Sequence, residues 1–281
     1  MNFITEHKIP LGQWMENFVD WLTNNAASFF DAISIFLETV IMSLVDVFQW
    51  MPAAVPMAIT ALLAWYLHRS IGLVIFIVAS LLLILNLGYW QEMLETFVLV
   101  FAATTISVLI GVPLGILAAH RPWLYTLLRP ILDLMQTVPT FVYLIPTLVL
   151  FGLGIVPGLI STIIFAIAAP IRLTYLGIIK VPAELIEAGK AFGASRFKLL
   201  YKVELPAALP SIMAGITQCI MLSLSMVVVA ALVGADGLGK PVIRALNTVN
   251  ISQGFEAGLA IVLVAIILDR LCKAPNQAKE G

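Results

Sequence analysis

Residues 187–206 read EAGKAFGASRFKLLYKVELP and form the longest polar passage in a chain that is otherwise mostly apolar. Small residues gather in its first half, where they allow another backbone to approach closely, and its charged residues keep it out of lipid. Pro182 before it and Pro206 after it separate the passage from the apolar segments on either side. A short, charged helix with a small-residue face, held between two membrane spans, indicates a docking surface. The alternative is an ordinary cytoplasmic loop, since such loops generally carry positive charge.

The composition is that of a membrane protein. Hydrophobic residues make up 61% of the chain and charged residues 11%, whereas a soluble domain has about 25% charged residues. We therefore expect an all-α, polytopic protein embedded in the lipid bilayer. The net charge of -1 argues against a nucleic-acid partner. Cys219 and Cys272 lie in or at the end of apolar runs, so we expect no disulfide. The histidines are scattered at His7, His68 and His120, so we expect no metal site. We find no Ser/His/Asp or Cys/His constellation, no paired carboxylates in a plausible cleft and no credible nucleotide loop, so we expect no catalytic residues and no bound cofactor.

Apolar runs predict about seven transmembrane helices. They lie at 52–67, 71–88, 93–118, 131–152, 156–179, 209–233 and 256–272. The first and last are short against the roughly 20 residues needed to cross a bilayer. Prolines interrupt the middle pair, at Pro139, Pro146, Pro157 and Pro170. Broken helices are tolerated only where protein or a water-lined cavity satisfies the freed backbone groups, so we expect 131–179 to line the pathway.

The N-terminal part of the chain predicts an amphipathic helix. Between residues 31 and 49 the polar positions fall on one helical arc and the large apolar residues mainly on the other. Three carboxylates in one span would be expensive, so we expect this helix to lie along the membrane surface; the three are Asp31, Glu38 and Asp46. An ordinary helix packed on the bundle is the alternative. Acidic residues and the lack of a clean apolar core argue against a cleavable signal peptide in the first 30 residues.

The basic residues predict the orientation. Eleven of the 15 Lys and Arg residues fall on one set of alternate loops, which includes residues 180–206. The positive-inside rule puts that set in the cytoplasm, with the N-terminus outside and the C-terminus inside. Arg172 and Asp133 are the ionisable residues nearest the bilayer interior, where each could line a pathway. We favour the alternative, in which Arg172 extends toward water and Asp133 pairs with Arg129, its i,i+4 neighbour.

A glycine-rich stretch at residues 234–241 reads GADGLGKP and nearly spells a phosphate-binding loop. Pro241 stands where the magnesium-binding hydroxyl belongs, and a proline cannot donate a backbone N–H to phosphate. No strand precedes the stretch, and the predicted topology puts it outside the cell. Nucleotide binding here is therefore rejected.

The polar passage resembles the cytoplasmic EAA loop of ABC importer permeases. The matching residues are Glu187, Ala188, Gly189, Gly193, Leu205 and Pro206. Gly189 stands where the family usually has Ala, and Val203 where it usually has Ile; neither change adds bulk. The 234–241 stretch in turn resembles the glycine-rich turn after the penultimate span of such permeases.

Other segments are similar to permeases for glycine betaine, proline and choline uptake, and the short ends favour the choline type. These segments are 132–146, 181–188, 222–228 and 265–271. The resemblance implies a type I ABC importer permease fold with an extracytoplasmic segment, two peripheral helices, a core domain that contains the cytoplasmic loop, and a cytoplasmic tail. The extracytoplasmic segment would be 1–51 and the two peripheral helices 52–90. The core domain would be 91–272, with the cytoplasmic loop at 180–206 inside it, and the cytoplasmic tail would be 273–281.

The same resemblance implies a working assembly in the bacterial cytoplasmic (inner) membrane. A second copy of the permease would complete the pathway, a cytoplasmic ATPase would use ATP and bind the EAA loops, and an extracytoplasmic binding protein would deliver a quaternary ammonium compound. Aromatic faces recognise such cations, so the pathway residues expected are Phe141, Tyr143 and Tyr175, with Pro139 and Pro146. A stand-alone secondary transporter or channel is the alternative, although we find no inverted repeat; a membrane scaffold is another.

Overall fold

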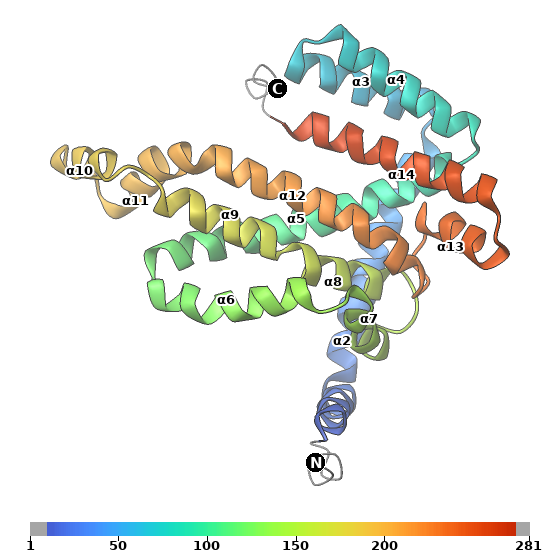
Figure 1. Ribbon diagram of the computed structural model, residues 1–281, viewed down its shortest axis with the longest axis horizontal. Helices are drawn as coiled ribbons and strands as arrows, with labels where there is room; N and C mark the ends of the chain where they lie inside the picture. The colour runs from blue at the N-terminus through green and yellow to red at the C-terminus, as the bar shows by residue number, and fades with distance from the viewer. Residues whose placement is uncertain (1–9, 274–281) are drawn as a thin grey trace, which may run out of the picture.

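Every regular element of the described chain is helical. The computed structural model describes residues 10–273, and Figure 1 shows their helices. In chain order they are α2 (Leu11–Trp50), α3 (Ala54–His68), α4 (Ile71–Asn86), α5 (Trp90–His120), α6 (Pro122–Thr137), α7 (Thr140–Phe151), α8 (Ile155–Ala166), α9 (Ala168–Ile179), α10 (Ala183–Ala191), α11 (Arg196–Leu199), the π-helix η1 (Leu200–Glu204), α12 (Leu205–Ala231), α13 (Gly239–Thr248) and α14 (Ile251–Cys272). The all-α prediction is confirmed.

Helices α5, α9 and α12 form the centre of the bundle, and glycines let them approach closely. A Cβ atom on Gly115 of α5 would lie 2.7 Å from the carbonyl oxygen of Ile171 and 2.7 Å from Cβ of Thr174, both on α9. On the other side of α9, a Cβ on Gly177 would lie 2.8 Å from Cβ of Ser211 on α12. Close backbone contact at small residues is how helices associate in lipid, where burial of apolar groups gives little driving force.

Within residues 10–273, five helical segments are long and apolar enough to cross a bilayer: α2, α5, α8 with α9, α12 with the helices before it, and α14. The α6–α7 pair is a sixth if it is counted as one broken span. This confirms a polytopic membrane protein. Helices α3 and α4 match two of the seven predicted spans, but they have only 15 and 16 residues, against about 20 for a helix that crosses unaided. The number seven stays a prediction.

The predicted span at 131–152 is broken into two helices, as the prolines within it led us to expect. Its first half belongs to α6, and α7 is bent away from α6 by 98°. Val138, which precedes Pro139, is extended, because the proline ring disfavours helical geometry in the residue before it. Pro146 lies inside α7 without ending it, and Pro157 and Pro170 lie in the first turns of α8 and α9. Among the four prolines, the sharp bend is therefore at Pro139.

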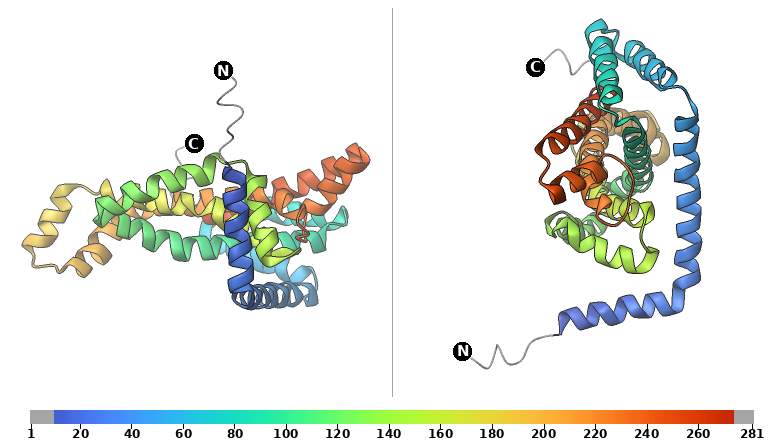
Figure 2. Two further views of the ribbon diagram at one scale, coloured as in Figure 1. Left: turned by 90° about the horizontal axis from the view of Figure 1, so that it is seen from below. Right: turned by 90° about the vertical axis from the view of Figure 1, so that its right-hand side faces the viewer.

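Helix α2 runs crosswise to the bundle. Its backbone kinks at Ala26, and Figures 1 and 2 show the part after the kink passing across the long helices near α7 and α8. Ile41 and Val45 are buried there against residues of α5 and α8. By length and composition α2 also qualifies as a span, so its predicted position along the membrane surface stays a prediction.

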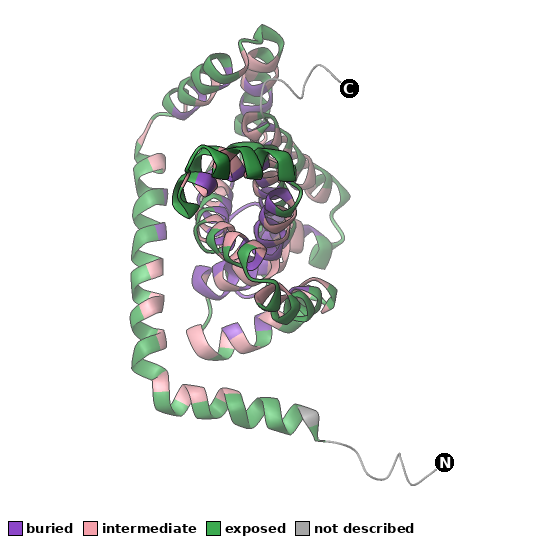
Figure 3. Ribbon diagram, turned by 90° about the vertical axis from the view of Figure 1, so that its left-hand side faces the viewer, coloured by how far each residue is buried: buried purple, intermediate pink, exposed green. Residues whose placement is uncertain are grey.

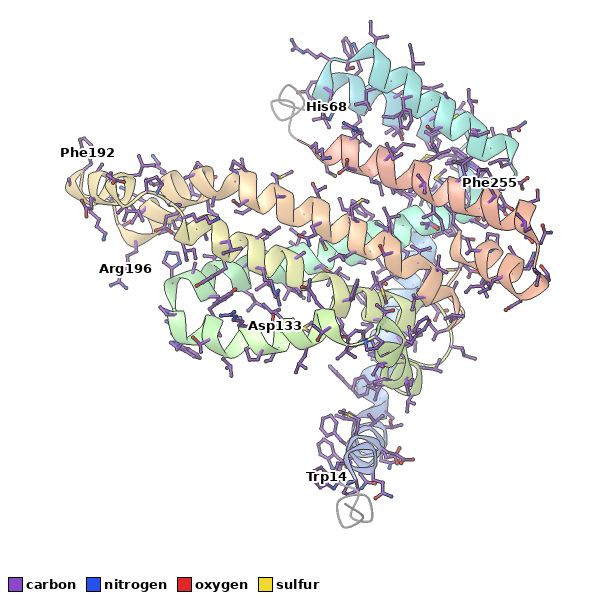
Figure 4. The ribbon with its side chains drawn as sticks, in the orientation of Figure 1. Trp14, His68, Asp133, Phe192, Arg196 and Phe255 are labelled. Atoms are coloured by element: carbon purple, nitrogen blue, oxygen red, sulfur yellow. The ribbon has the colours of Figure 1, made fainter. Side chains whose placement is uncertain are left out.

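The helix connections fall at two ends of the molecule. Those after α3, α5 and α9 and the end of α14 lie toward the left in Figure 1, and those after α4, α7 and α12 toward the right. Figure 4 places His68, Phe192 and Arg196 toward the first end and Phe255 at the second. The basic alternate loops thus share one end within the described chain. The predicted tail lies outside the described residues after Lys273.

Candidate functional site

The candidate site is the loop of residues 180–206, which projects beyond the bundle (Figure 1). It consists of α10, a turn, α11 and η1, and it leads directly into α12. Pro182, extended at ψ 133°, starts α10, and Ser195 starts α11 by accepting a hydrogen bond from the N–H of Lys198 through its side chain. Figure 3 looks at the molecule from this end and shows the projecting helices as mostly exposed.

Gly193 shapes the turn after α10. Its φ is +74°, a left-handed conformation that residues with a side chain rarely adopt. Its N–H donates to the carbonyl oxygen of Lys190 at 2.9 Å, and the N–H of Ala194 donates to that of Gly189 at 3.0 Å, a common way to end a helix. No other heavy atom lies within 4 Å of a Cβ built on Gly193. Backbone conformation, not space within this chain, is what favours glycine here.

Gly189 and Val203, the two departures from the EAA pattern, lie close together in the folded loop. A Cβ on Gly189 would lie 2.7 Å from Cδ1 of Leu199 and 3.6 Å from Cγ2 of Val203. Leu199 is buried between α10 and the rest of the loop. Small residues at both 189 and 203 therefore let α10 pack closely on α11 and η1.

The other predicted loop residues separate into an outer and an inner set. Glu187, Ala188 and Pro206 are exposed. Leu205 is half-buried and packs on the buried cluster around Ile178 at the inner end of the loop. The outer set is free to contact a partner, and the inner set fixes the loop on the bundle.

Exposed aromatic residues on this loop were missed by the sequence analysis. Phe192, next to the Gly193 turn, is 92% exposed, and Phe197 and Tyr201 are also exposed. The rings of Phe197 and Tyr201 stack with centroids 6.5 Å apart. Large apolar groups gathered on a charged surface mark an interaction site. The signal was present in the sequence as three aromatic residues within the most polar passage.

A close contact between His120 and Glu204 ties the loop to the end of α5. Nε2 of His120 lies 2.9 Å from Oε2 of Glu204, a carboxylate that is only 6% exposed. Nδ1 of His120 lies 2.9 Å from the carbonyl oxygen of Ile116 and must carry a proton to donate there. His120 had looked like an isolated loop histidine, because nothing in the sequence links it to Glu204.

We predict that His120→Ala loosens this loop. The substitution leaves the Glu204 side chain buried without its polar partner, at a cost on the order of 1 kcal/mol because half-exposed His120 lets water screen the contact. Trypsin should then cut at Arg196 and Lys198 several times faster in the detergent-solubilised protein. His120→Gln, whose amide can still donate to Glu204, should be cut at nearly the wild-type rate. Equal cleavage of all three proteins would show that the pair does not hold the loop.

The predicted pathway residues do not come together in one place. Phe141 is exposed and Pro146 half-buried on α7, whereas Tyr175 lies on α9 with its ring stacked on that of Tyr125, 3.5 Å between centroids. The hydroxyl of Tyr143 donates to the carbonyl oxygen of Met135 at 2.7 Å. Tyr143 thus satisfies a carbonyl freed at the α6–α7 bend, next to Pro139, which is a structural task.

The glycine-rich turn at 234–241 packs on the bundle. The N–H of Leu238 donates to the hydroxyl of Thr96 at 2.8 Å, and a Cβ on Gly239 would lie 2.4 Å from the carbonyl oxygen of Val227. Lys240 is ion-paired with Asp236. The glycines here allow close packing, in agreement with the rejection of a phosphate loop. Within residues 10–273, no group of three His, Cys, Asp or Glu side chains is arranged to hold a metal ion.

Comparison with known proteins gives consistent matches. The family model described as "Binding-protein-dependent transport system inner membrane component" matches residues 111–274, more than half of the chain. The chain is 46% identical to the glycine betaine transport system permease protein OpuAB of Bacillus subtilis, with 94% of this chain and 93% of that protein covered. It is 45% identical to the glycine betaine/carnitine transport permease protein GbuB of Listeria monocytogenes, with 96% of each covered.

A third relative and a solved structure agree with these matches. The glycine betaine/proline betaine transport system permease protein ProW of Escherichia coli is 42% identical over 95% of this chain and 75% of its own length. Among solved structures, an inward-facing conformation of the MetNI methionine ABC transporter has a chain that matches with a TM-score of 0.57 and 25% identity. That match covers 64% of this chain and 91% of the other.

Proposed function

This chain belongs to the family of binding-protein-dependent transport system inner membrane components, and from that membership we propose that it forms the transport pathway of an ATP-driven importer of glycine betaine and related quaternary ammonium compounds. The observation that carries the proposal is the projecting 180–206 loop. Its outer face and its Gly193 turn are free for a partner, while its inner face is fixed to α5, α9 and α12. Movement of a docked ATPase would therefore reach the bundle directly.

The substrate class rests on the relatives. Those that match nearly the whole chain are named for glycine betaine, carnitine and proline betaine, so we put glycine betaine ahead of choline, which the short ends had favoured. Uptake of radiolabelled glycine betaine, carnitine, proline and choline tests this in cells that also produce the ATPase and the binding protein. Accumulation of glycine betaine supports the proposal. Accumulation of none of the four above the control without this chain would refute it.

Membership in this family implies a separate ATPase and a separate binding protein, and it places the chain in the inner membrane. We further propose that two copies of the chain enclose the pathway and that two ATPases bind their 180–206 loops. Residues 91–272 would be the core permease domain, with α3 and α4 peripheral and α2 along the membrane surface. No catalytic residue is assigned to the chain, because ATP hydrolysis belongs to the partner.

We also propose that the N-terminus is outside and the C-terminus inside, and we predict the labelling pattern that follows. Leu246 of α13 is 76% exposed and lies near the end opposite the 180–206 loop, on which Lys190 is exposed. With Cys219 and Cys272 replaced by serine, an impermeant thiol reagent should label Leu246→Cys from outside intact cells. It should label Lys190→Cys only after permeabilisation, in cells without the ATPase. Labelling of both from the same side would contradict this topology.

A further inference from the structure

Two side-chain contacts join α6 to α9 along one seam. Nη2 of Arg172 donates to Oδ1 of Asp133 at 2.5 Å. The rings of Tyr125 and Tyr175 are stacked, with an interplanar angle of 5°. Figure 4 shows Asp133 on the side of α6 that faces α9. The expected pairing of Asp133 with Arg129 is therefore wrong, because Arg172 on the neighbouring helix reaches the carboxylate.

This seam lies within the membrane-spanning part of the chain. Arg172 belongs to the candidate span Ile155–Ile179, and Asp133 lies on the last turns of α6 before the bend. Both side chains remain accessible in the single chain, 29% for Arg172 and 52% for Asp133. Ionised groups at such depth avoid lipid and face protein or a water-filled cavity. The exposed side of the α6–α9 seam must therefore face protein or water and not lipid.

Both charges and the aromatic faces belong to one surface. Tyr125 lies about two turns before Asp133 on α6, and Arg172 and Tyr175 are one turn apart on α9. The two tyrosines are half-buried, since each ring covers one face of the other. The seam thus carries an ion pair and, about two turns of α6 away, a stacked pair of tyrosine rings.

We propose that this seam, formed by Asp133, Arg172, Tyr125 and Tyr175, is a transient binding site for a small zwitterion that carries a carboxylate and a quaternary ammonium group. The guanidinium of Arg172 takes the carboxylate of the zwitterion and Asp133 takes the ammonium, while the stacked tyrosines join α6 to α9 beside them. A bare charge is costly to hold away from water. A zwitterion can open the internal ion pair and still leave every charge with a partner. The inference rests on the proposed function and assigns a site in the pathway for that substrate class.

Transport per ATP hydrolysed is the quantity that tests this site. The complete complex, with its ATPase and binding protein, is reconstituted in proteoliposomes, and glycine betaine uptake and ATP hydrolysis are measured together. Asp133→Asn and Arg172→Gln should each lower the betaine moved per ATP by about tenfold or more, the loss expected for one charge-assisted hydrogen bond. ATP hydrolysis stimulated by the binding protein should stay near the wild-type rate. Lys273→Gln, which breaks the Asp269–Lys273 pair on α14, serves as the control and should keep the wild-type ratio.

Two results would overturn the site. Either the betaine moved per ATP is unchanged in both variants, or uptake, hydrolysis and thermal stability fall together, as they would if the pair only held α6 on α9. A wild-type complex that moves no betaine would instead refute the proposed function itself, so the two failures are distinguishable.

A cysteine at Gln136 gives a second test that leaves the charges in place. Gln136 is half-buried on α6, less than one turn from Asp133. In the complete complex, an impermeant thiol reagent should reach Gln136→Cys through water, and saturating glycine betaine with its binding protein should slow that reaction. The same concentration of salt in place of glycine betaine should not slow it. A cysteine that is never labelled, or that betaine does not protect, would contradict a water-filled zwitterion site even if the charge variants failed to assemble.

Discussion

Gly193→Asp is expected to abolish glycine betaine uptake and to prevent the ATPase from co-purifying, while the abundance of the chain in the membrane stays normal. The left-handed backbone at Gly193 costs a residue with a side chain about 1–2 kcal/mol, and aspartate tolerates that conformation better than most. No atom of this chain stands within 4 Å of a Cβ there. The added carboxylate would therefore disturb the contact with the partner, not the fold of the bundle. Uptake, pull-down of the ATPase and immunoblotting of membranes measure the three effects.

Gly193→Asn is the matched control, because asparagine has nearly the same shape and the same tolerance of a left-handed backbone. It differs in charge alone, so it should keep a larger share of uptake than Gly193→Asp. Glu187→Lys, which reverses the charge of an exposed residue on the same loop, is expected to resemble Gly193→Asp. If Gly193→Asp retained wild-type uptake with the ATPase bound, the loop would not be the docking surface.

Gly115→Leu is expected to destroy the folded bundle. A Cβ alone at this position would lie 2.7 Å from the backbone oxygen of Ile171, and a backbone atom in a packed helix cannot move aside cheaply. Overpacking of this kind costs typically 1–3 kcal/mol and more where helices must separate. The detergent-purified protein should show a large fall in yield and in its unfolding temperature.

Gly72→Leu tests the same substitution at a site without close neighbours. Gly72 is exposed on α4, and the nearest atom to its Cβ position is Oγ of Ser70 at 4.0 Å. Yield and unfolding temperature should stay near wild type. If Gly115→Leu were as stable as Gly72→Leu, the close approach of α5 and α9 would be wrong.

Local chemistry explains what could be predicted from the sequence. The 180–206 loop stands out because polar residues interrupt apolar runs, and the backbone at Gly193 adopts the conformation that only glycine enters freely. Most predicted spans coincide with helices because length and apolar composition are properties of each segment alone. The basic loops share one end of the molecule because successive spans run in opposite directions, so alternate loops come out at the same end.

Contacts between distant segments explain what could not be predicted. Asp133 was assigned to Arg129 by helical spacing, yet its partner Arg172 lies on another helix, and Glu204 pairs with His120 at the far end of α5. Beyond the 98° bend at Pro139, α7 packs against α2 and α8, which are far from it in the predicted order of spans or separated from it by a turn. A proline signals a break but not its direction. For the same reason the sequence could not tell that α2 crosses the bundle.

Uptake by proteoliposomes with and without the ATPase tests the central claim, that this chain is a pathway driven by a separate ATPase docked on residues 180–206. The vesicles contain the purified chain and the binding protein, and accumulation of radiolabelled glycine betaine is followed after addition of ATP on the side of the loop. We predict accumulation only when the ATPase is present and ATP can be hydrolysed. Equal accumulation in vesicles that lack the ATPase, driven by an ion gradient, would contradict the account and identify a secondary transporter.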